Sequence, residues 1–299
     1  MTSQASKGQG SNAPRFSILI INPNTSPHMT EALRPSVEKL DYADVQIEYF
    51  TAPSTPTVTP DGTEIQGIPS INSGADSSLS AHHCFPHLKK LLDKYDAFLV
   101  ACFSAHPLVG MLKREIRLRQ RHSLKKERKY VTGIFEASIS TCLTLTRDFS
   151  LSADTDSKRV VSASSFGIVT TATAWKDELT TAVQQLLLGD QTEKQRDDAS
   201  RLDVFAGVGT TGLTAAELHD TPAEEVRARI ADVTEQLIKD SRRPVAAICL
   251  GCAAMAGMDA AVREGCVRAL GRFEGENVFI VDGVLSGLGA LVNACKAEF

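Results

Sequence analysis

Two cysteines stand at positions where a thiol could carry out acid–base chemistry. Cys102 follows the apolar run AFLVA and Cys252 follows VAAICLG, and each precedes small or polar residues and then a helical pattern. A thiol near a helix N-terminus can ionise close to neutral pH, because the partial positive charge there favours the thiolate. Two such thiols on opposite sides of a substrate carbon could remove a proton from one face and return one to the other. We predict that Cys102 and Cys252 form this pair.

The chain has seven cysteines, and most free cysteines are small buried core residues. We give that structural interpretation to four that lie within helical patterns: Cys84, Cys142, Cys266 and Cys295. Cys102 and Cys252 differ because each ends a unit of nearly equal length. Asn22 and Cys102 are 80 positions apart, and Thr170 and Cys252 are 82 positions apart. This spacing indicates two repeated units that each bring one thiol to a shared cleft.

The elements that would position these thiols alternate between strand and helix. Short apolar runs typical of buried parallel strands include FSILIIN, VQIEYF, AFLVACF, YVTGIF, FGIVTT, VAAICLGC and NVFIVDG. Helical patterns lie between them, over residues 73–95, 107–121, 174–188, 222–240 and 259–273. This alternation predicts an α/β fold with parallel sheets flanked by helices. Ligands bind beyond the carboxyl ends of such strands, which is where both cysteines fall.

The composition of the 299 residues excludes several classes of protein. A net charge of −4 and a pI near 6.0 provide no field that would attract nucleic acid or an anionic membrane. No apolar run reaches the roughly 20 residues that span a bilayer, and the polar N-terminus lacks the apolar core of a secretory signal. An odd number of scattered cysteines indicates reduced thiols. We therefore expect a soluble, cytoplasmic protein that binds neither nucleic acid nor membranes.

Two further groups of cysteines and histidines suggest other chemistry less strongly. Cys249 and Cys252 form a C-x-x-C, but Cys249 lies inside the predicted strand, unlike the first cysteine of a redox dithiol, and no second C-x-x-C completes a zinc site. One helical pattern could offer metal ligands on a single face, from His82, His83, Cys84 and His87. No H-E-x-x-H accompanies these residues, so we expect no metal there.

Two more patterns resemble binding motifs without the context that those motifs require. The glycines at 207, 209 and 212 form G-x-G-x-x-G, yet the helical pattern that follows begins only near Pro222, where Thr221 and two glutamates mark a helix start. The basic stretch at 113–129 lacks interleaved aromatic residues. We interpret it as a solvated helix face or an oligomer contact.

Six segments resemble the hydantoin and allantoin racemase family of the Asp/Glu racemase superfamily. In the order of the family they are INPNTSPHMT (21–30), GIPSINSGAD (67–76), ACFSAHPLVGMLKRE (101–115), FEAS (135–138), FGIVTT (166–171) and LGCAAM (250–255). They are distributed over nearly all of the chain beyond Phe16. As a set they are specific, although each motif alone is weak.

The resemblance implies two similar α/β domains, related by a pseudo-twofold axis, with the active site in the interdomain cleft. It also implies that Cys102 and Cys252 are the catalytic pair and that neither a metal nor another cofactor takes part. The substrate-binding residues implied by the matching segments are Asn22, Asn24, Thr25, Pro69, Ser70, Ile71, Phe103, Ser104, His106, Thr170, Thr171 and Ala253. His106 could tune Cys102 or contact the substrate, or could serve only to start a helix.

The implied reaction is racemisation of a 5-substituted hydantoin or of allantoin, which is a small-molecule ring substrate. One thiolate would remove the ring proton next to a carbonyl, backbone amides near Ser104 or Ala253 would hold the enolate, and the other thiol would protonate the opposite face. The alternatives are a maleate isomerase or arylmalonate-type decarboxylase of the same superfamily, or a non-catalytic binder of small molecules.

Two departures from the bacterial pattern bear on the substrate. Ala105 and His106 precede Pro107, where bacterial hydantoin racemases usually have an aspartate directly before the proline. Ala254 also replaces a glycine of the second cysteine motif. The C-F-S-x-H-P form resembles the fungal branch of the family, whose members are associated with nitrogen metabolism.

From these observations together we predict a tail over residues 1–15 and two domains. The first domain would cover 16–130 and 276–299, because the last strand and helix return to the first domain in the family, and the second would cover 131–275. Residues 151–159 and 189–200 are polar and are interpreted as surface insertions. A homo-oligomer is expected because relatives form them.

Overall fold

The computed structural model describes residues 14–59, 61–121, 127–146, 149–150, 160–161, 164–189 and 203–299. Its first half contains a four-stranded parallel sheet with the order β2-β1-β5-β6. These strands are β1 (Phe16–Asn22), β2 (Val45–Thr51), β5 (Ala97–Val100) and β6 (Tyr130–Gly133). Every residue of β5 is fully buried, as expected for a central parallel strand that is covered on both faces.

The second half repeats this arrangement. Its parallel sheet has the order β10-β9-β11-β12. When the strands of each sheet are numbered along the chain, the order across both sheets is second, first, third and fourth. The four strands are β9 (Ser165–Thr170), β10 (Phe205–Thr210), β11 (Val245–Leu250) and β12 (Phe279–Asp282). Two parallel sheets of the same strand order confirm the predicted fold class.

The strand register places the two cysteines at equivalent positions. Val100, at the end of β5, is paired with Ile21 of β1, and Leu250, at the end of β11, is paired with Val169 of β9. Each cysteine follows its strand after one intervening residue, which is Ala101 in the first half and Gly251 in the second. Both thiols therefore lie at the carboxyl edge of a sheet, next to the last residue of the neighbouring strand.

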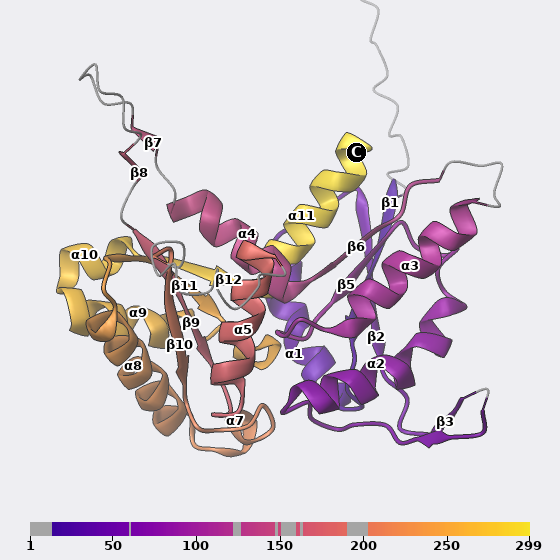
Figure 1. Ribbon diagram of the computed structural model, residues 1–299, viewed down its shortest axis with the longest axis horizontal. Coiled ribbons are helices and arrows are strands. Elements are labelled where there is room, and N and C mark those ends of the chain that lie inside the picture. Colours follow the sequence, from indigo (N-terminus) through magenta and orange to yellow (C-terminus); the bar gives the residue numbers. More distant parts are fainter. Residues whose placement is uncertain are drawn as a thin grey trace, which may run out of the picture.

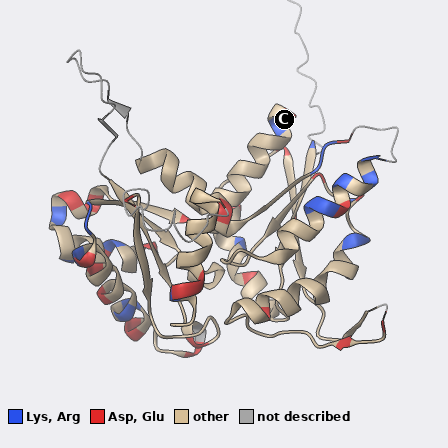
Figure 2. Ribbon diagram, viewed as in Figure 1, with Lys and Arg blue, Asp and Glu red and all other residues tan. Residues whose placement is uncertain are grey.

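Helices cover both faces of each sheet. In the first half they are α1 (Pro27–Glu38), α2 (Gly74–Lys89) and α3 (Pro107–Arg121), and α2 and α3 pack over one face of the sheet. In the second half they are α5 (Trp175–Leu188), α7 (Glu217–Asp220), α8 (Ala223–Asp240), α9 (Asp259–Leu270) and α10 (Arg272–Asn277). Figure 2 shows Lys and Arg along α3, whereas α8 and α9 carry both signs of charge. Short strand pairs complete the chain: β3 (Thr57–Val58) with β4 (Glu64–Ile65), and β7 (Phe149–Ser150) with β8 (Val160–Val161).

Two helices link the halves. Helix α4 (Ile134–Thr146) follows β6 of the first sheet but packs against β11 of the second, and α11 (Gly283–Ala297) follows β12 of the second sheet but packs against β5 and β6 of the first. They pack closely against each other between the two sheets (Figure 1). A side chain at Gly283 would collide with Ser138 of α4, so the glycine permits this close approach.

The predicted domain border needs two corrections. Strand β12 was expected in the first domain, but it pairs with β11 in the second sheet, from Ala247 with Phe279 to Leu250 with Asp282. The proposed division after residue 130 also cuts through β6, which belongs to the first sheet. The C-terminal helix does pack on the first sheet, so only the helix returns. The predicted tail, apart from its last two residues, and most of the two predicted insertions lie outside the described residues.

Within the described residues, no helix is long and apolar enough to cross a membrane.

Candidate active site

Cys102 lies in the turn between β5 and α3. Backbone hydrogen bonds shape this turn, because the Ser104 N–H donates to the Cys102 carbonyl at 3.0 Å and the His106 N–H donates to the Ser104 carbonyl at 2.7 Å. The Ser104 hydroxyl lies 3.5 Å from Cys102 Sγ and 3.3 Å from the Ser77 hydroxyl. Both serines are buried, whereas Cys102 as a whole residue is only partly buried. Ser104 therefore contacts the thiol through its hydroxyl, while its backbone N–H is already engaged.

Cys252 immediately precedes a single 3₁₀ turn over Ala253–Met255. The backbone N–H groups of Ala254 and Met255 and the hydroxyl of Thr171 each lower the pKa of the thiol. The Met255 N–H also donates to the Cys252 carbonyl at 3.0 Å. Burial acts in the opposite direction and is the larger effect, so the pKa is raised to about 11. The first N–H groups of a helical turn carry partial positive charge, and they therefore favour the thiolate.

Cys102 has a weaker set of partners. Burial raises its pKa to about 12, the Ser104 hydroxyl lowers it, and negative charge on Cys252 and on Glu136 raises it further. Negative charge on Cys252 thus acts on Cys102, although the two cysteines follow strands of different sheets. The expectation that helix N-termini would lower the pKa of both thiols is wrong for this structure. Burial outweighs the donors at Cys252, and α3 begins only at Pro107.

His106 starts α3 and has no charge to offer the thiol. Its Nδ1 accepts a hydrogen bond from the Leu108 N–H at 3.3 Å, which caps the helix. Burial lowers its pKa to about 4, so the imidazole is neutral at physiological pH. Its Nε2 is buried and has no hydrogen-bond partner among the described residues. Of the three roles predicted for His106, the structure supports the helix start.

The loop after β1 is held by its own asparagines. Asn22 is buried and its Nδ2 donates to Asn24 Oδ1, to the Ser26 carbonyl and to Thr30 Oγ1, at 3.0, 3.1 and 3.0 Å. Asn24 Oδ1 in turn accepts from the Ser26 N–H at 2.9 Å. The Thr25 N–H donates to the Ile68 carbonyl at 2.9 Å, which joins this loop to the segment 67–72. These side chains are committed to loop structure.

The other predicted residues of the first half divide into loop and core. The Pro69 carbonyl accepts from Ser26 Oγ at 2.8 Å, and Ser70 Oγ lies 3.2 Å from Asn72 Oδ1. Ile71 is 7% exposed and belongs to the core. Phe103 is also buried, and its ring meets that of Phe135 edge to face at 5.6 Å. The ring of Phe103 therefore supports the Cys102 turn from the core side.

The predicted residues of the second half surround Cys252 directly. The Thr171 hydroxyl lowers the pKa of the Cys252 thiol, and Thr170 Oγ1 donates to the Gly251 carbonyl at 2.5 Å, next to the cysteine. Ala253 is the first residue of the 3₁₀ turn. Thr170 is the last residue of β9, and Thr171 follows it. The strand next to β11 therefore holds the Cys252 turn through both threonines.

A cavity of about 410 Å³ lies between the two halves, beside the Cys102 turn. Its walls come from the start of α2, the turn at Ser104–Pro107 and one face of α5. Ser77 and Ser104 line it from the first half, and Trp175, Asp177 and Glu178 line it from the second. Neither cysteine is among its lining residues, but Ser104 lines it and has its hydroxyl 3.5 Å from the Cys102 sulfur.

Sequence analysis missed Glu136 and Ser77 as site residues. Glu136 acts on Cys102 and has a buried, unpartnered Oε2 atom. It lies within the motif FEAS, where an acidic residue interrupts the apolar stretch YVTGIFEASIS. A charged residue in such a stretch is the signal that could have drawn attention to it, because buried acids are retained mainly where they are paired or functional.

The histidines that suggested a metal have structural partners. The Nδ1 atom of the buried His83 lies 2.9 Å from Thr57 Oγ1, and His87 Nε2 lies 3.0 Å from the same hydroxyl. Both rings thus anchor β3 to α2. Cys249 lies inside β11 as predicted, and its Sγ lies 3.2 Å from Cys142 Sγ in the core.

Comparisons with known proteins place this chain in a family. The Asp/Glu/hydantoin racemase family matches residues 18–291. An uncharacterized protein of Schizosaccharomyces pombe is 31% identical over 279 residues, covering 93% of this chain and 92% of its own length. Among solved structures, the fold is similar to that of an allantoin racemase from Klebsiella pneumoniae (TM-score 0.64, 19% identity, 95% of this chain and 89% of that chain). It is also similar to an allantoin racemase from Pseudomonas fluorescens (TM-score 0.62, 20% identity, 95% and 92%). The chain has an Asp/Glu racemase-like fold, and it belongs to the Asp/Glu/hydantoin racemase family.

Proposed function

We propose that this protein is an isomerase that racemises 5-substituted hydantoins or allantoin without a cofactor, with Cys102 and Cys252 as the two acid–base groups. The observation that carries the proposal is the equivalent placement of the two thiols. Each follows the third strand of its sheet, and a negative charge on Cys252 raises the pKa of Cys102. Two thiols from two sheets suit a reaction that needs groups on opposite faces of one carbon.

The proton transfers balance within the pair. Cys252 Sγ, as thiolate, takes the proton from the ring carbon next to the carbonyl, and the electron pair moves onto the carbonyl oxygen as an enolate. Cys102 Sγ, as thiol, then donates its proton to the opposite face of that carbon. The product is the other enantiomer, and the thiol and thiolate have exchanged places. The reverse reaction, or proton exchange with solvent, restores the starting state.

The hydrogen bonds already made limit which groups can donate to the enolate oxygen. The Ser104 N–H donates to the Cys102 carbonyl and the Met255 N–H donates to the Cys252 carbonyl. The N–H groups of Ala254 and Met255 also favour the thiolate form of Cys252. The Ala253 N–H at the start of the 3₁₀ turn and the Ser104 hydroxyl are therefore the groups that we assign to the enolate. Donors of this kind typically contribute about 3–4 kcal/mol to the transition state.

The test is the loss of optical rotation of an enantiopure 5-substituted hydantoin, and of allantoin, in D₂O. Wild type should racemise at least one of these rings and incorporate deuterium at the ring carbon. Cys102→Ser and Cys252→Ser should each reduce racemisation by at least about 10³-fold, since proton-transfer groups of this kind contribute roughly 10²–10⁴ in rate. Each variant should still exchange deuterium into one enantiomer only, and the two variants should differ in which one.

Product analysis distinguishes the alternatives. Racemisation leaves the mass of the undeuterated product unchanged, decarboxylation lowers it, and maleate isomerisation is followed with a different substrate by the conversion of a cis to a trans double bond. If wild type alters none of these rings and catalyses neither other reaction, yet binds a hydantoin, the chain is a small-molecule binder and the proposal fails.

A further inference from the structure

A second cavity, of about 370 Å³, lies at the edge of the first sheet. Its walls come from α3 (113–120) and α11 (290–294), and its floor comes from residues 129–132 around β6; we call it the β6 groove. It shares no lining residue with the cavity beside the Cys102 turn. Because four consecutive residues line it and alternate side chains of a strand point to opposite faces, the free edge of β6 forms the floor. A cavity of this volume is typical of a site for a small molecule.

The bottom of the β6 groove is apolar. Ile116, Val131 and Leu291, which come from the three different elements, line it and are buried. On the α11 side the groove is bordered by Ala290 and Ala294, whose small side chains leave the space open. The groove therefore offers an apolar surface that can cover the body of a ligand.

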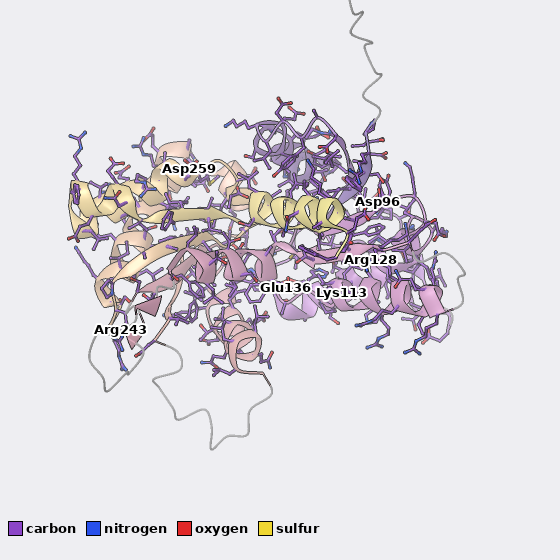
Figure 3. All side chains as sticks on the ribbon, turned by 90° about the horizontal axis from the view of Figure 1, so that it is seen from above. Asp96, Lys113, Arg128, Glu136, Arg243 and Asp259 are labelled. Carbon is purple, nitrogen blue, oxygen red and sulfur yellow. The ribbon has the colours of Figure 1, made fainter. Side chains whose placement is uncertain are left out.

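The charged side chains that line the β6 groove are all cationic. They are Lys113, Arg117 and Lys129, and no acidic residue is among the described residues that line it. Lys129 Nζ donates to a backbone carbonyl, and neither Lys113 nor Arg117 forms an ion pair with any residue that the structure describes. The charge of Lys113 favours the ionised form of Glu136, but that carboxyl does not line the groove (Figure 3).

Another cation of the same helix shows the contrast. Arg119 is paired with Asp93 at 2.8 Å and with Glu115 at 3.2 Å, and it does not line the groove. The cations of α3 that do line the groove thus lack such acidic partners, in a chain whose net charge is −4. Positive charge without a partner beside an apolar surface favours an anionic ligand.

We propose that the β6 groove binds a small amphiphilic anion, which is a molecule with one acid group on an apolar body. The body lies on the buried apolar residues of the floor, and the acid group lies at Lys113 and Arg117. A second copy of the chain that met this groove with its own groove would bring six cations together, which is unfavourable. The proposed racemisation plays no part in this argument.

Binding of 8-anilinonaphthalene-1-sulfonate to the full-length protein tests the proposal, because this probe is an amphiphilic anion that fluoresces on apolar surfaces. Wild type should bind it saturably. Octanoate, octanol and octylamine, which share one chain length, are then compared as competitors. Octanoate should displace the probe at a concentration at least about fivefold lower than either of the others, because only its carboxylate can pair with the cations.

Two pairs of charges on α3 provide a matched comparison. Lys113→Gln with Arg117→Gln removes two cations of the groove and should raise the Kd of the probe roughly five- to twentyfold. Arg114→Gln with Arg121→Gln removes the same charge from the same helix outside the groove, and should leave the Kd within about twofold of wild type. All four side chains are exposed, and circular dichroism checks that each variant is folded.

A second pair of variants fills the groove without changing charge. Ala290→Trp places an indole ring in the groove from α11 and should abolish octanoate-sensitive binding, whereas Asn293→Trp, on an exposed position of the same helix outside the groove, should retain it. Binding that survives in Ala290→Trp locates the probe elsewhere and overturns the proposal. Equal competition by the three competitors also overturns it, because the groove would then select no charge.

An absence of saturable binding in wild type overturns the proposal as well. Light scattering then identifies the other occupant: if wild type is an oligomer that Ala290→Trp dissociates, a second copy of the chain covers the groove. Racemisation is not measured in any of these experiments, so their failure is distinct from a failure of the proposed function.

Discussion

The turns after β5 and β11 hold their thiols by different means, although the two sheets have the same strand order. At Cys252 two N–H groups of a 3₁₀ turn and the Thr171 hydroxyl lower the pKa of the thiol, whereas at Cys102 one serine hydroxyl does so. The two halves thus repeat the position of the thiol but not the groups around it. Two sheets of the same strand order can therefore place two thiols at equivalent positions while the turns around them give the thiols unequal pKa values. A reaction with one acid and one base requires such a difference.

The pH dependence provides the largest expected effect. Burial raises the pKa of Cys252 to about 11 and that of Cys102 to about 12, so roughly one Cys252 thiol in a thousand is ionised at pH 8. In the proposed reaction the active form has one thiolate and one thiol, so its population rises with pH until the first pKa is reached. We expect kcat/KM to increase about tenfold per pH unit from pH 7 to 10.

Initial rates, corrected for racemisation without enzyme, check this expectation, and circular dichroism confirms that the chain stays folded at each pH. A rate that is already constant between pH 7 and 9 would show that one thiol is ionised at neutral pH. In that case the donors around Cys252 would outweigh burial, and the difference between the two turns would be larger than we infer.

The residue before each cysteine offers a test of the two turns as structures. A β-carbon at Gly251 would lie 2.8 Å from the β-carbon of Thr170 and 2.9 Å from the Val169 carbonyl, which is backbone and cannot turn away. The corresponding residue of the first half is Ala101, which is buried and accommodates its methyl group. We expect Gly251→Ala to lower the free energy of unfolding by about 2 kcal/mol, a typical cost of overpacking.

Denaturant unfolding measures this change. Ala101→Gly is the matched variant and should cost no more than about 1 kcal/mol, mainly through backbone entropy. Gly251→Ala should also reduce activity, because it displaces the Cys252 turn. Equal losses of stability in the two variants would show that the second turn is as tolerant as the first.

The sequence predicted the fold well because its signals are local. Apolar runs and helical periodicity located the strands and most helices, and the helix pattern at 107–121 matches α3 residue for residue. Cys142 was expected within a helix, but the start of α4 was not located because β6 runs into it without a polar break: the apolar run YVTGIF contains both the strand end at Gly133 and the helix start at Ile134. Periodicity cannot divide so short a buried run.

Non-local facts could not be predicted in this way. The pattern of NVFIVDG identifies a strand but not its neighbour, so β12 was assigned to the wrong sheet. The placement of both cysteines at strand ends was predicted, and their catalytic roles stay predictions. The acidity of each thiol was not, since it depends on burial and on groups such as Glu136 that the fold brings close. Burial removes water from around a thiol only in the folded chain, so the sequence alone does not indicate the resulting pKa.

The smallest expected effect compares the hydroxyl groups beside the two thiols. The Thr171 hydroxyl lowers the pKa of Cys252, and the Ser104 hydroxyl lowers that of Cys102. Thr171→Val keeps the shape of the side chain and removes the hydroxyl, so it should raise the pKa of Cys252 and slow its alkylation by iodoacetamide at pH 8 about three- to fivefold, equivalent to roughly half a pKa unit. Thr171→Ser restores a hydroxyl and should restore most of the rate.

Ser104→Ala should act on the other thiol alone, slowing alkylation of Cys102 while leaving Cys252 within about twofold of wild type. Since Ser104 is the main group that favours the Cys102 thiolate, its loss should widen the difference in reactivity between the two thiols, whereas the loss of the Thr171 hydroxyl should narrow it. Opposite changes in the ratio of the two rates would mean that each turn sets its own thiol. If both variants shift the ratio in the same direction, the thiols titrate as one coupled pair and cannot be assigned separate acidities.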